Sequence, residues 1–178
     1  MGGLRPYDVI PASLATLVLL VALVMQFRRK GPGLGGALAM VGLAILWIRM
    51  DFGAHTLLSG SDYFLRIFPP PPIDTSAAGP FVREMTRVGM YDLIKVFEVI
   101  AGAMIVANVF TPLALVLEFP ITVSIFWLSV MVVGVGRPVF TGWRELFLNT
   151  LLLAAYAGYY LPMLDLKPRQ RPLWSLSA

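Results

Sequence analysis

The sequence predicts an all-α, polytopic membrane protein with five spans, because five long apolar stretches follow one another along a short chain. Of its 178 residues, 58% are hydrophobic and only 13% are charged, whereas soluble domains carry roughly 25% charged residues. The mean hydropathy is +0.79. Each membrane helix needs about 20 apolar residues, so the length suffices for one small bundle. The composition excludes a soluble globular domain, a disordered chain and a disulfide-stapled secreted module.

The first apolar stretch runs from about Val9 to Phe27 and ends in the basic cluster 28–30. The basic residues follow the apolar run, and no small-residue cleavage site is present there. This pattern is typical of an uncleaved anchor rather than a signal peptide. Residues 1–33 therefore form an expected anchor helix and basic turn, which precede a membrane domain over residues 34–178.

The second apolar stretch covers 35–58 and the third covers 88–110. The connection between them, residues 59–87, is too polar and too broken to span a membrane. It contains four consecutive prolines, 69–72, which favour an extended polyproline segment. We expect an extracytoplasmic loop over 59–87.

The fourth stretch covers 112–133, with an interruption at Glu118-Phe-Pro120, and the fifth covers 143–163. Aromatic residues near the ends of the fifth stretch are typical of an interfacial belt. The basic cluster at 28–30 places the N-terminus outside and the C-terminus in the cytoplasm. The expected location is a bacterial cytoplasmic (inner) membrane.

Ionisable side chains inside the spans form a candidate polar or ligand-binding cluster. Charged groups in a membrane are costly and normally face a partner inside the bundle. If the second and third spans are antiparallel, an acid lies opposite a base at each depth, with Asp51–Lys95 and His55–Asp92 as direct pairs. Arg49 points the opposite way from Asp51, so its partner is Glu98 or lies elsewhere. The cluster comprises Arg49, Asp51, His55, Asp92, Lys95 and Glu98.

Two interpretations of this cluster remain open. It is either a polar pocket or proton-handling site that opens toward the outer face, or an ion-pair network that fixes helix register. Glu118 stands apart, because the inner half of the fourth span offers it no obvious basic partner. It is a candidate proton site, or it binds backbone groups freed by Pro120. A single histidine cannot build a multi-histidine metal site, so no metal is expected.

Composition also limits cofactors and partners. The chain has no cysteine, which excludes disulfides, iron–sulfur clusters and thiolate metal sites. The formal net charge is +4. Because the basic residues lie mainly between apolar runs, membrane topology and anionic lipid explain them better than nucleic acid does. No nucleophile set or other catalytic residues can be assembled.

The stretch from Gly89 to Pro120 carries a Lys95-x-x-Glu98 pair, Gly102, and an Asn108-x-Phe-x-Pro112 turn. It resembles the DoxX/DoxX-like membrane family, best over 89–125 and more loosely over 40–163. The resemblance implies a four-helix bundle formed by the second to fifth spans. That family is related to the small subunits of a thiosulfate:quinone oxidoreductase, and some members are accessory or assembly partners. The additional helix 9–27 and Ser124, where asparagine is expected, depart from the pattern.

Three function hypotheses follow. The first is a non-catalytic accessory subunit that packs against other subunits of a larger membrane complex, such as an electron-transport one. The second is a membrane subunit of a quinone-linked oxidoreductase with a polar quinone pocket, whose electrons come from another subunit. The third is a small transporter or proton path. No covalent cofactor is expected, and quinone or lipid is the candidate ligand.

Overall fold

The computed structural model describes residues 6–30, 36–69 and 76–164, and within these ranges the protein is helical with no strand. The long helices are α1, α2, α4, α5 and α6, and α3 is a shorter one. A π-helical segment, η1, continues α5, and a 3₁₀ turn, η2, follows the short helix α7. Their bounds are α1 Pro6–Lys30, α2 Gly36–Leu65, α3 Ala78–Arg87, α4 Met90–Ala107, α5 Thr111–Phe126, η1 Trp127–Val133, α6 Arg137–Ala155, α7 Ala157–Tyr160 and η2 Leu161–Leu164.

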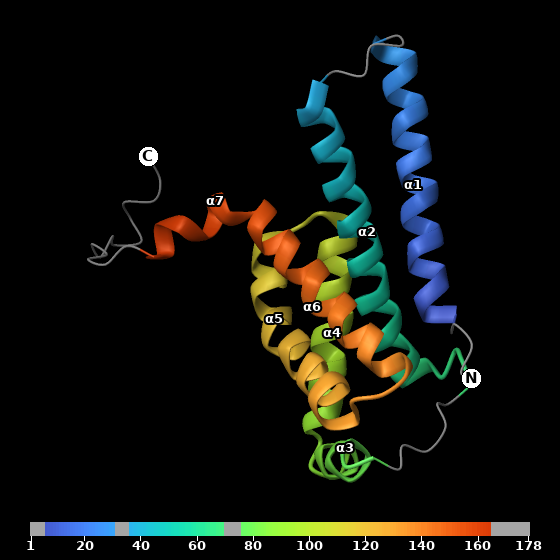
Figure 1. Ribbon diagram of the computed structural model, residues 1–178, viewed down its shortest axis with the longest axis vertical. Coiled ribbons are helices and arrows are strands. Elements are labelled where there is room, and N and C mark those ends of the chain that lie inside the picture. Colours follow the sequence, from blue (N-terminus) through green and yellow to red (C-terminus); the bar gives the residue numbers. More distant parts are fainter. Residues whose placement is uncertain (1–5, 31–35, 70–75, 165–178) are drawn as a thin grey trace.

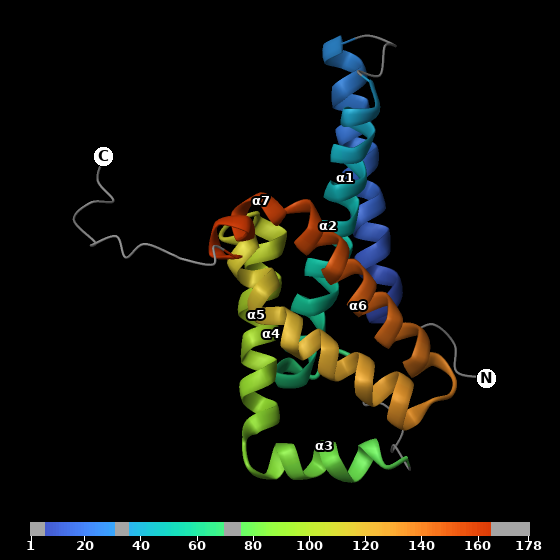
Figure 2. The ribbon, with the colours of Figure 1, turned by 60° about the vertical axis from the view of Figure 1, so that its left-hand side comes forward.

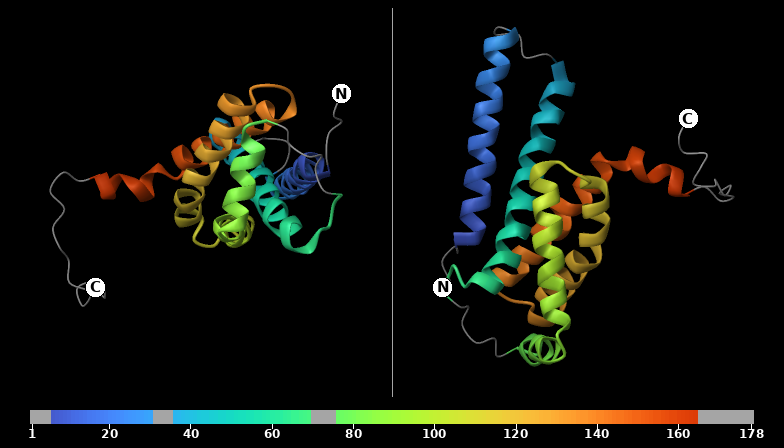
Figure 3. Two further views of the ribbon diagram at one scale, coloured as in Figure 1. Left: turned by 90° about the horizontal axis from the view of Figure 1, so that it is seen from below. Right: turned by 180° about the vertical axis from the view of Figure 1, so that it is seen from behind.

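Helices α2, α4, α5 and α6 form a bundle, and α1 packs along the outside of α2 (Figure 1). Helix α3 lies across one end of the bundle and runs crosswise to α4 (Figure 2). At the opposite end, α1 and the first half of α2 extend beyond the other helices as a two-helix hairpin (Figure 3). Only the second half of α2 thus belongs both to the α1–α2 pair and to the four-helix bundle.

Two helices of the described part are long and apolar enough to cross a membrane, Met40–Leu65 and Thr111–Val133. A third is added if α6 and the α7–η2 segment, which are bent by 69°, count as one span. The apolar part of α1, Val9–Met25, is shorter, and the 18-residue α4 carries three charged side chains. The structure therefore supports an all-helical membrane protein, while the five-span arrangement stays a prediction.

The helix ends differ from the predicted ones in ways that matter for the site. Helix α2 continues to Leu65 instead of ending near Leu58, and part of the expected loop forms α3. Gly89 separates α3 from α4 with φ of +75°, a left-handed conformation that glycine adopts without strain. Of the predicted polyproline segment, residues 70–72 lie outside the described residues.

Helix α5 passes through Pro120 without a break, where the sequence predicted an interruption. Proline removes one backbone N–H from the helix ladder. Hydroxyl groups in the next turns add bonds there: the Thr122 hydroxyl donates to the Glu118 carbonyl at 3.0 Å, and the Ser124 hydroxyl donates to the Pro120 carbonyl at 2.9 Å. Side-chain hydroxyls commonly supply such bonds near prolines in membrane helices.

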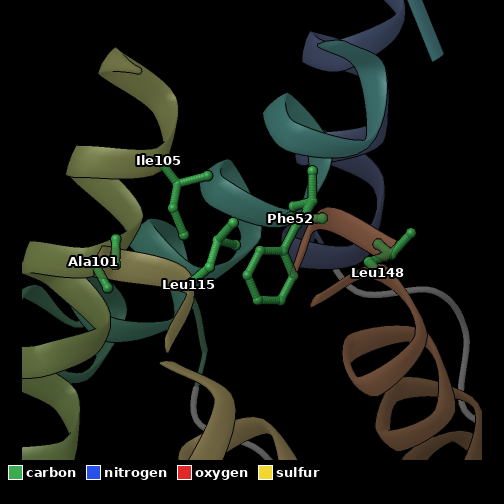
Figure 4. Packing of buried hydrophobic residues seen from close by; sticks show 7 residues of the cluster. Phe52, Ala101, Ile105, Leu115 and Leu148 are labelled. Carbon is green, nitrogen blue, oxygen red and sulfur yellow. The ribbon is translucent and has the colours of Figure 1, made fainter. Parts of the chain in front are cut away.

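The apolar core lies in the middle of the bundle, where α2, α4, α5 and α6 meet. Figure 4 shows Phe52 between Leu115 on one side and Leu148 on the other, with Ala101 and Ile105 contributed by α4. All five are buried. This core separates the hairpin end of the molecule from the α3 end, where the polar side chains collect.

Candidate functional site

Helices α2 and α4 are antiparallel neighbours, as predicted, but their register differs from the expected one. A Cβ atom on Gly60 would lie 2.8 Å from the Lys95 carbonyl oxygen, so Lys95 faces Gly60 rather than Asp51. The predicted ends of the two spans were Leu58 and Val88, whereas α2 ends at Leu65 and α4 begins at Met90. Together, these two differences displace the contacts of α2 with α4 along the helix axis by about 13 Å from the predicted contacts, at about 1.5 Å per residue.

As a result, Asp51 and His55 pair with α6 instead of α4. Arg144 donates to Asp51 at 2.7 Å and to Glu145 at 2.6 Å, while His55 Nδ1 lies 3.1 Å from the Glu145 carboxylate. The carboxylates and the histidine are all buried. The predicted Asp51–Lys95 and His55–Asp92 pairs are therefore wrong, and an α2–α6 network replaces them.

Lys95 pairs within its own helix. Its ammonium group lies 2.9 Å and 2.7 Å from the two Glu98 oxygens, and it also donates to the Ser59 hydroxyl at 3.0 Å. The ring of Tyr91 is 5.2 Å from the same nitrogen. An ion pair with this geometry and additional hydrogen bonds is well compensated for its burial.

The remaining two members of the predicted cluster lie apart from these pairs. Arg49 donates to the backbone carbonyls of Ile105 at 2.7 Å and Val106 at 3.2 Å, near the C-terminal end of α4. Carbonyls in the last turn of a helix lack the usual partner four residues on and carry partial negative charge. Asp92 accepts a hydrogen bond from the hydroxyl of Tyr63. Of the two alternatives left open for Arg49, Glu98 is not its partner, and Arg49 instead joins α2 to α4 through backbone carbonyls.

Glu118 is 3% exposed, and its Oε2 atom has no hydrogen-bond partner. The sequence predicted that Glu118 stands apart from the other charged groups, but it lines the same cavity as Lys95 and Glu98. No described residue forms an ion pair with it, as expected. Its neighbours are polar: the Asn149 side chain donates to the Thr122 hydroxyl at 3.0 Å, and that hydroxyl donates to the Glu118 carbonyl. The α5–α6 contact thus contains a short polar chain beside the free carboxyl oxygen.

A cavity of about 970 Å³ connects these groups. It lies between α2, α4, α5 and α6 at the α3 end of the bundle, with α3 residues at its edge. Its lining combines aromatic, hydroxyl and charged side chains. The ionisable groups facing it include His55, Tyr63, Tyr91, Lys95, Glu98, Glu118 and Glu145. The volume lies within the range of small-molecule sites, roughly 300–1,000 Å³.

A second, more apolar hollow of about 630 Å³ lies between α1, α2 and α6. Asp51 and Arg144 line it, while Glu145, which also binds Arg144, faces the larger cavity. Trp47 crosses to α1 by donating its indole N–H to the Thr16 hydroxyl at 3.2 Å. The Asp51–Arg144–Glu145 network therefore lies in the wall between the two hollows.

Sequence analysis missed Arg144 and Glu145 as site residues. The predicted fifth stretch began at 143, which left Arg144 and Glu145 at its outer end, whereas α6 begins at Arg137 and places them about two turns inside the helix. The sequence does contain a pattern that could have identified Glu145. The spacing of one helix face is followed by Glu145, Leu148, Asn149 and Leu152. All four are buried on that face.

The described residues contain no group of three or more histidine and acidic side chains placed to hold a metal ion. Comparison of the chain with family models, curated proteins and solved structures finds no match.

Proposed function

We propose that this chain is an integral membrane protein that binds a small molecule in the cavity between α2, α4, α5 and α6. The observation that carries the proposal is the cavity itself, whose volume and mixed polar and aromatic lining suit one small ligand. Several of its charged groups are tied to each other, and such pairs hold the neighbouring helices in a fixed arrangement. The ammonium group of Lys95, which contacts the Ser59 hydroxyl, is held by both Glu98 oxygens and is thus a poor general base, so the proposed role is binding rather than catalysis.

Quinone is one candidate ligand, as the sequence suggested. Its two carbonyl oxygens need donors, and Ser59 and Tyr91 on the cavity wall carry hydroxyl groups able to donate. The resemblance to DoxX-like proteins, related to the small subunits of a thiosulfate:quinone oxidoreductase, supports the same ligand class. In this version the chain is a subunit of a quinone-linked electron-transport complex.

A cavity-filling substitution tests the binding proposal. Ile125 lines the cavity, whereas Val123 on the same helix is 40% exposed and does not line it. Binding of decylubiquinone and of tetraphenylphosphonium to the purified chain in nanodiscs is measured by equilibrium dialysis. We expect at least one probe to bind, Ile125→Trp to abolish that binding, and Val123→Trp to preserve it. If neither probe binds the wild type, or if Ile125→Trp binds normally, the cavity is not a ligand site.

A second proposed role, as an accessory subunit of a larger membrane complex, is favoured by the hairpin of α1 and α2. Since Arg49 contacts the end of α4, residues 36–48 extend beyond α4 by about 20 Å. Apolar side chains on this hairpin are exposed, among them Leu17, Leu20 and Met40. A neighbouring membrane subunit would cover them.

Substitution on the hairpin tests this role. Leu20 on α1 and Leu93 on α4 are 54% and 55% exposed, so they form a matched pair. The chain is purified from its native membranes in mild detergent, and its assembly state is measured by native mass spectrometry. We expect a hetero-oligomer that Leu20→Gln dissociates and Leu93→Gln leaves intact. A stable wild-type monomer without a membrane partner would refute the accessory role.

For the location, we propose a bacterial cytoplasmic membrane with the N-terminus outside and the C-terminus inside. The basic cluster that ends the first apolar stretch supports this orientation, because short cytoplasmic segments are enriched in lysine and arginine. Cysteines introduced one at a time at Gly2 and Ser177 test it. A membrane-impermeant maleimide added to intact cells should label only the Gly2→Cys variant.

A further inference from the structure

Among the buried charged groups around the cavity, one carboxylate has no cation as partner. Lys95 contacts both oxygens of Glu98. Arg144 divides its guanidinium between Asp51 and Glu145. Lys95 and Arg144 are thus each already paired with a carboxylate group.

Glu118 faces the same cavity from α5. It is almost completely buried, and its Oε2 atom has no hydrogen-bond partner. The charged groups that line the cavity with it are His55 and Asp62 on α2, the exposed Arg66 just after α2, Lys95 and Glu98 on α4, and Glu145 on α6. With the Glu118 carboxylate included, the lining holds more acidic than basic groups, so a positive ligand would restore the local balance.

We propose that the cavity binds a monovalent organic cation, a substituted ammonium or a similar onium group, with the Glu118 carboxylate as its counter-ion. The inference rests on the proposed ligand-binding function and names the chemical class of the ligand. A buried carboxylate without a partner is costly, and an opposite charge brought to within a few ångströms offsets that cost.

The aromatic part of the lining favours an organic cation. Tyr63 and Tyr91 meet edge to face with their ring centroids 5.4 Å apart, and Phe64 and Phe68 line the same cavity. Aromatic faces attract organic cations by cation–π interaction, and Tyr91 already lies near the ammonium group of Lys95. A cavity of about 970 Å³ also holds far more than a single metal ion.

Hydrogen-bonding chemistry separates this ligand class from a quinone at the same position. A quinone carbonyl is an acceptor, and the free Oε2 atom of an ionised Glu118 is an acceptor too, so the two atoms do not pair. An onium group brings a positive charge, with or without N–H donors. The unpartnered carboxylate oxygen is therefore compensated by a cation and not by an oxidised quinone.

Binding of tetraphenylphosphonium to the full-length protein in nanodiscs, measured by equilibrium dialysis, tests the proposal. The charge-removing variant is Glu118→Gln, which keeps the shape of the side chain. The matched control is Glu84→Gln on α3, where the carboxylate is exposed and pairs with Arg87. We expect Glu118→Gln to weaken binding about tenfold or more and Glu84→Gln to leave it within about twofold.

A neutral probe keeps the test valid even if Glu118→Gln does not fold. Triphenylphosphine oxide shares the triphenylphosphorus group of the cation but carries no net charge, so the wild type should bind it at least about tenfold more weakly. Equal binding of the two probes, or unchanged binding in Glu118→Gln, would overturn the cation proposal. If the wild type binds decylubiquinone but not tetraphenylphosphonium, the cation proposal is overturned while the proposed ligand-binding function stands. If it binds neither probe, both proposals are overturned.

Discussion

Replacing Arg144 with methionine removes the cation that two buried carboxylates share. Arg144 lies 2.7 Å from Asp51 and 2.6 Å from Glu145, and the two carboxylate side chains are only 2% and 5% exposed. Methionine has a similar length but no charge, so both carboxylates lose their arginine partner while remaining buried. Breaking a buried ion pair on one side typically costs about 3–5 kcal/mol. We therefore expect the free energy of unfolding of Arg144→Met to fall by about that amount.

The assay is reversible unfolding of the purified protein in mixed micelles, followed by circular dichroism. The control is Arg87→Met, because the Arg87–Glu84 pair is an exposed ion pair and its loss should be hardly measurable. The double variant Arg144→Met with Asp51→Leu should recover part of the loss, since one orphaned carboxylate is then removed. If Arg144→Met is as stable as Arg87→Met, the network does not hold α2 to α6 and the reasoning fails.

Two further predictions concern packing. Gly102→Ala places a Cβ atom 2.4 Å from the backbone nitrogen of Leu57, so the Tm of thermal unfolding should be clearly lower. The control is Gly42→Ala, whose Cβ atom would meet nothing within 4 Å and which should not lower the Tm. An unchanged Tm for Gly102→Ala would contradict the close α2–α4 contact. Leu152→Ala empties a fully buried position and should cost about 2–5 kcal/mol in the micelle assay. The same change at Leu151, which is 38% exposed, should cost clearly less, and equal costs would contradict the assigned core face of α6.

The sequence predicts the helices better than it predicts their pairing. Apolar runs place the long helices, because hydrophobicity and length dominate that signal. The ends are harder to predict, since polar residues such as Ser59 and Asp62 near the end of α2 are compatible with either helix or loop. An error of seven residues at Leu58 then transfers to every predicted contact of α2 with α4.

The candidate site shows the same limit. Burial of the charged residues in α2 and α4 follows from their apolar surroundings, and six of the seven predicted residues line one of the hollows or bind a residue that does. Their partners depend on which helix lies beside which face, and that is a tertiary property. Arg144 and Glu145 lie about 90 residues from Asp51 and His55, so no local pattern could have linked them.

The glycine contacts between α2 and α4 have a mechanical consequence. At Gly53, Gly60 and Gly102 the two helices are in contact, with no room for one additional carbon atom. We therefore expect α2 and α4 to move as one rigid unit. The opposite wall of the cavity differs, because α5 passes into the π-helical segment η1, whose described residues are not buried. If the cavity widens to admit a ligand, α5 and η1 should therefore move, while α2 and α4 keep their positions relative to each other.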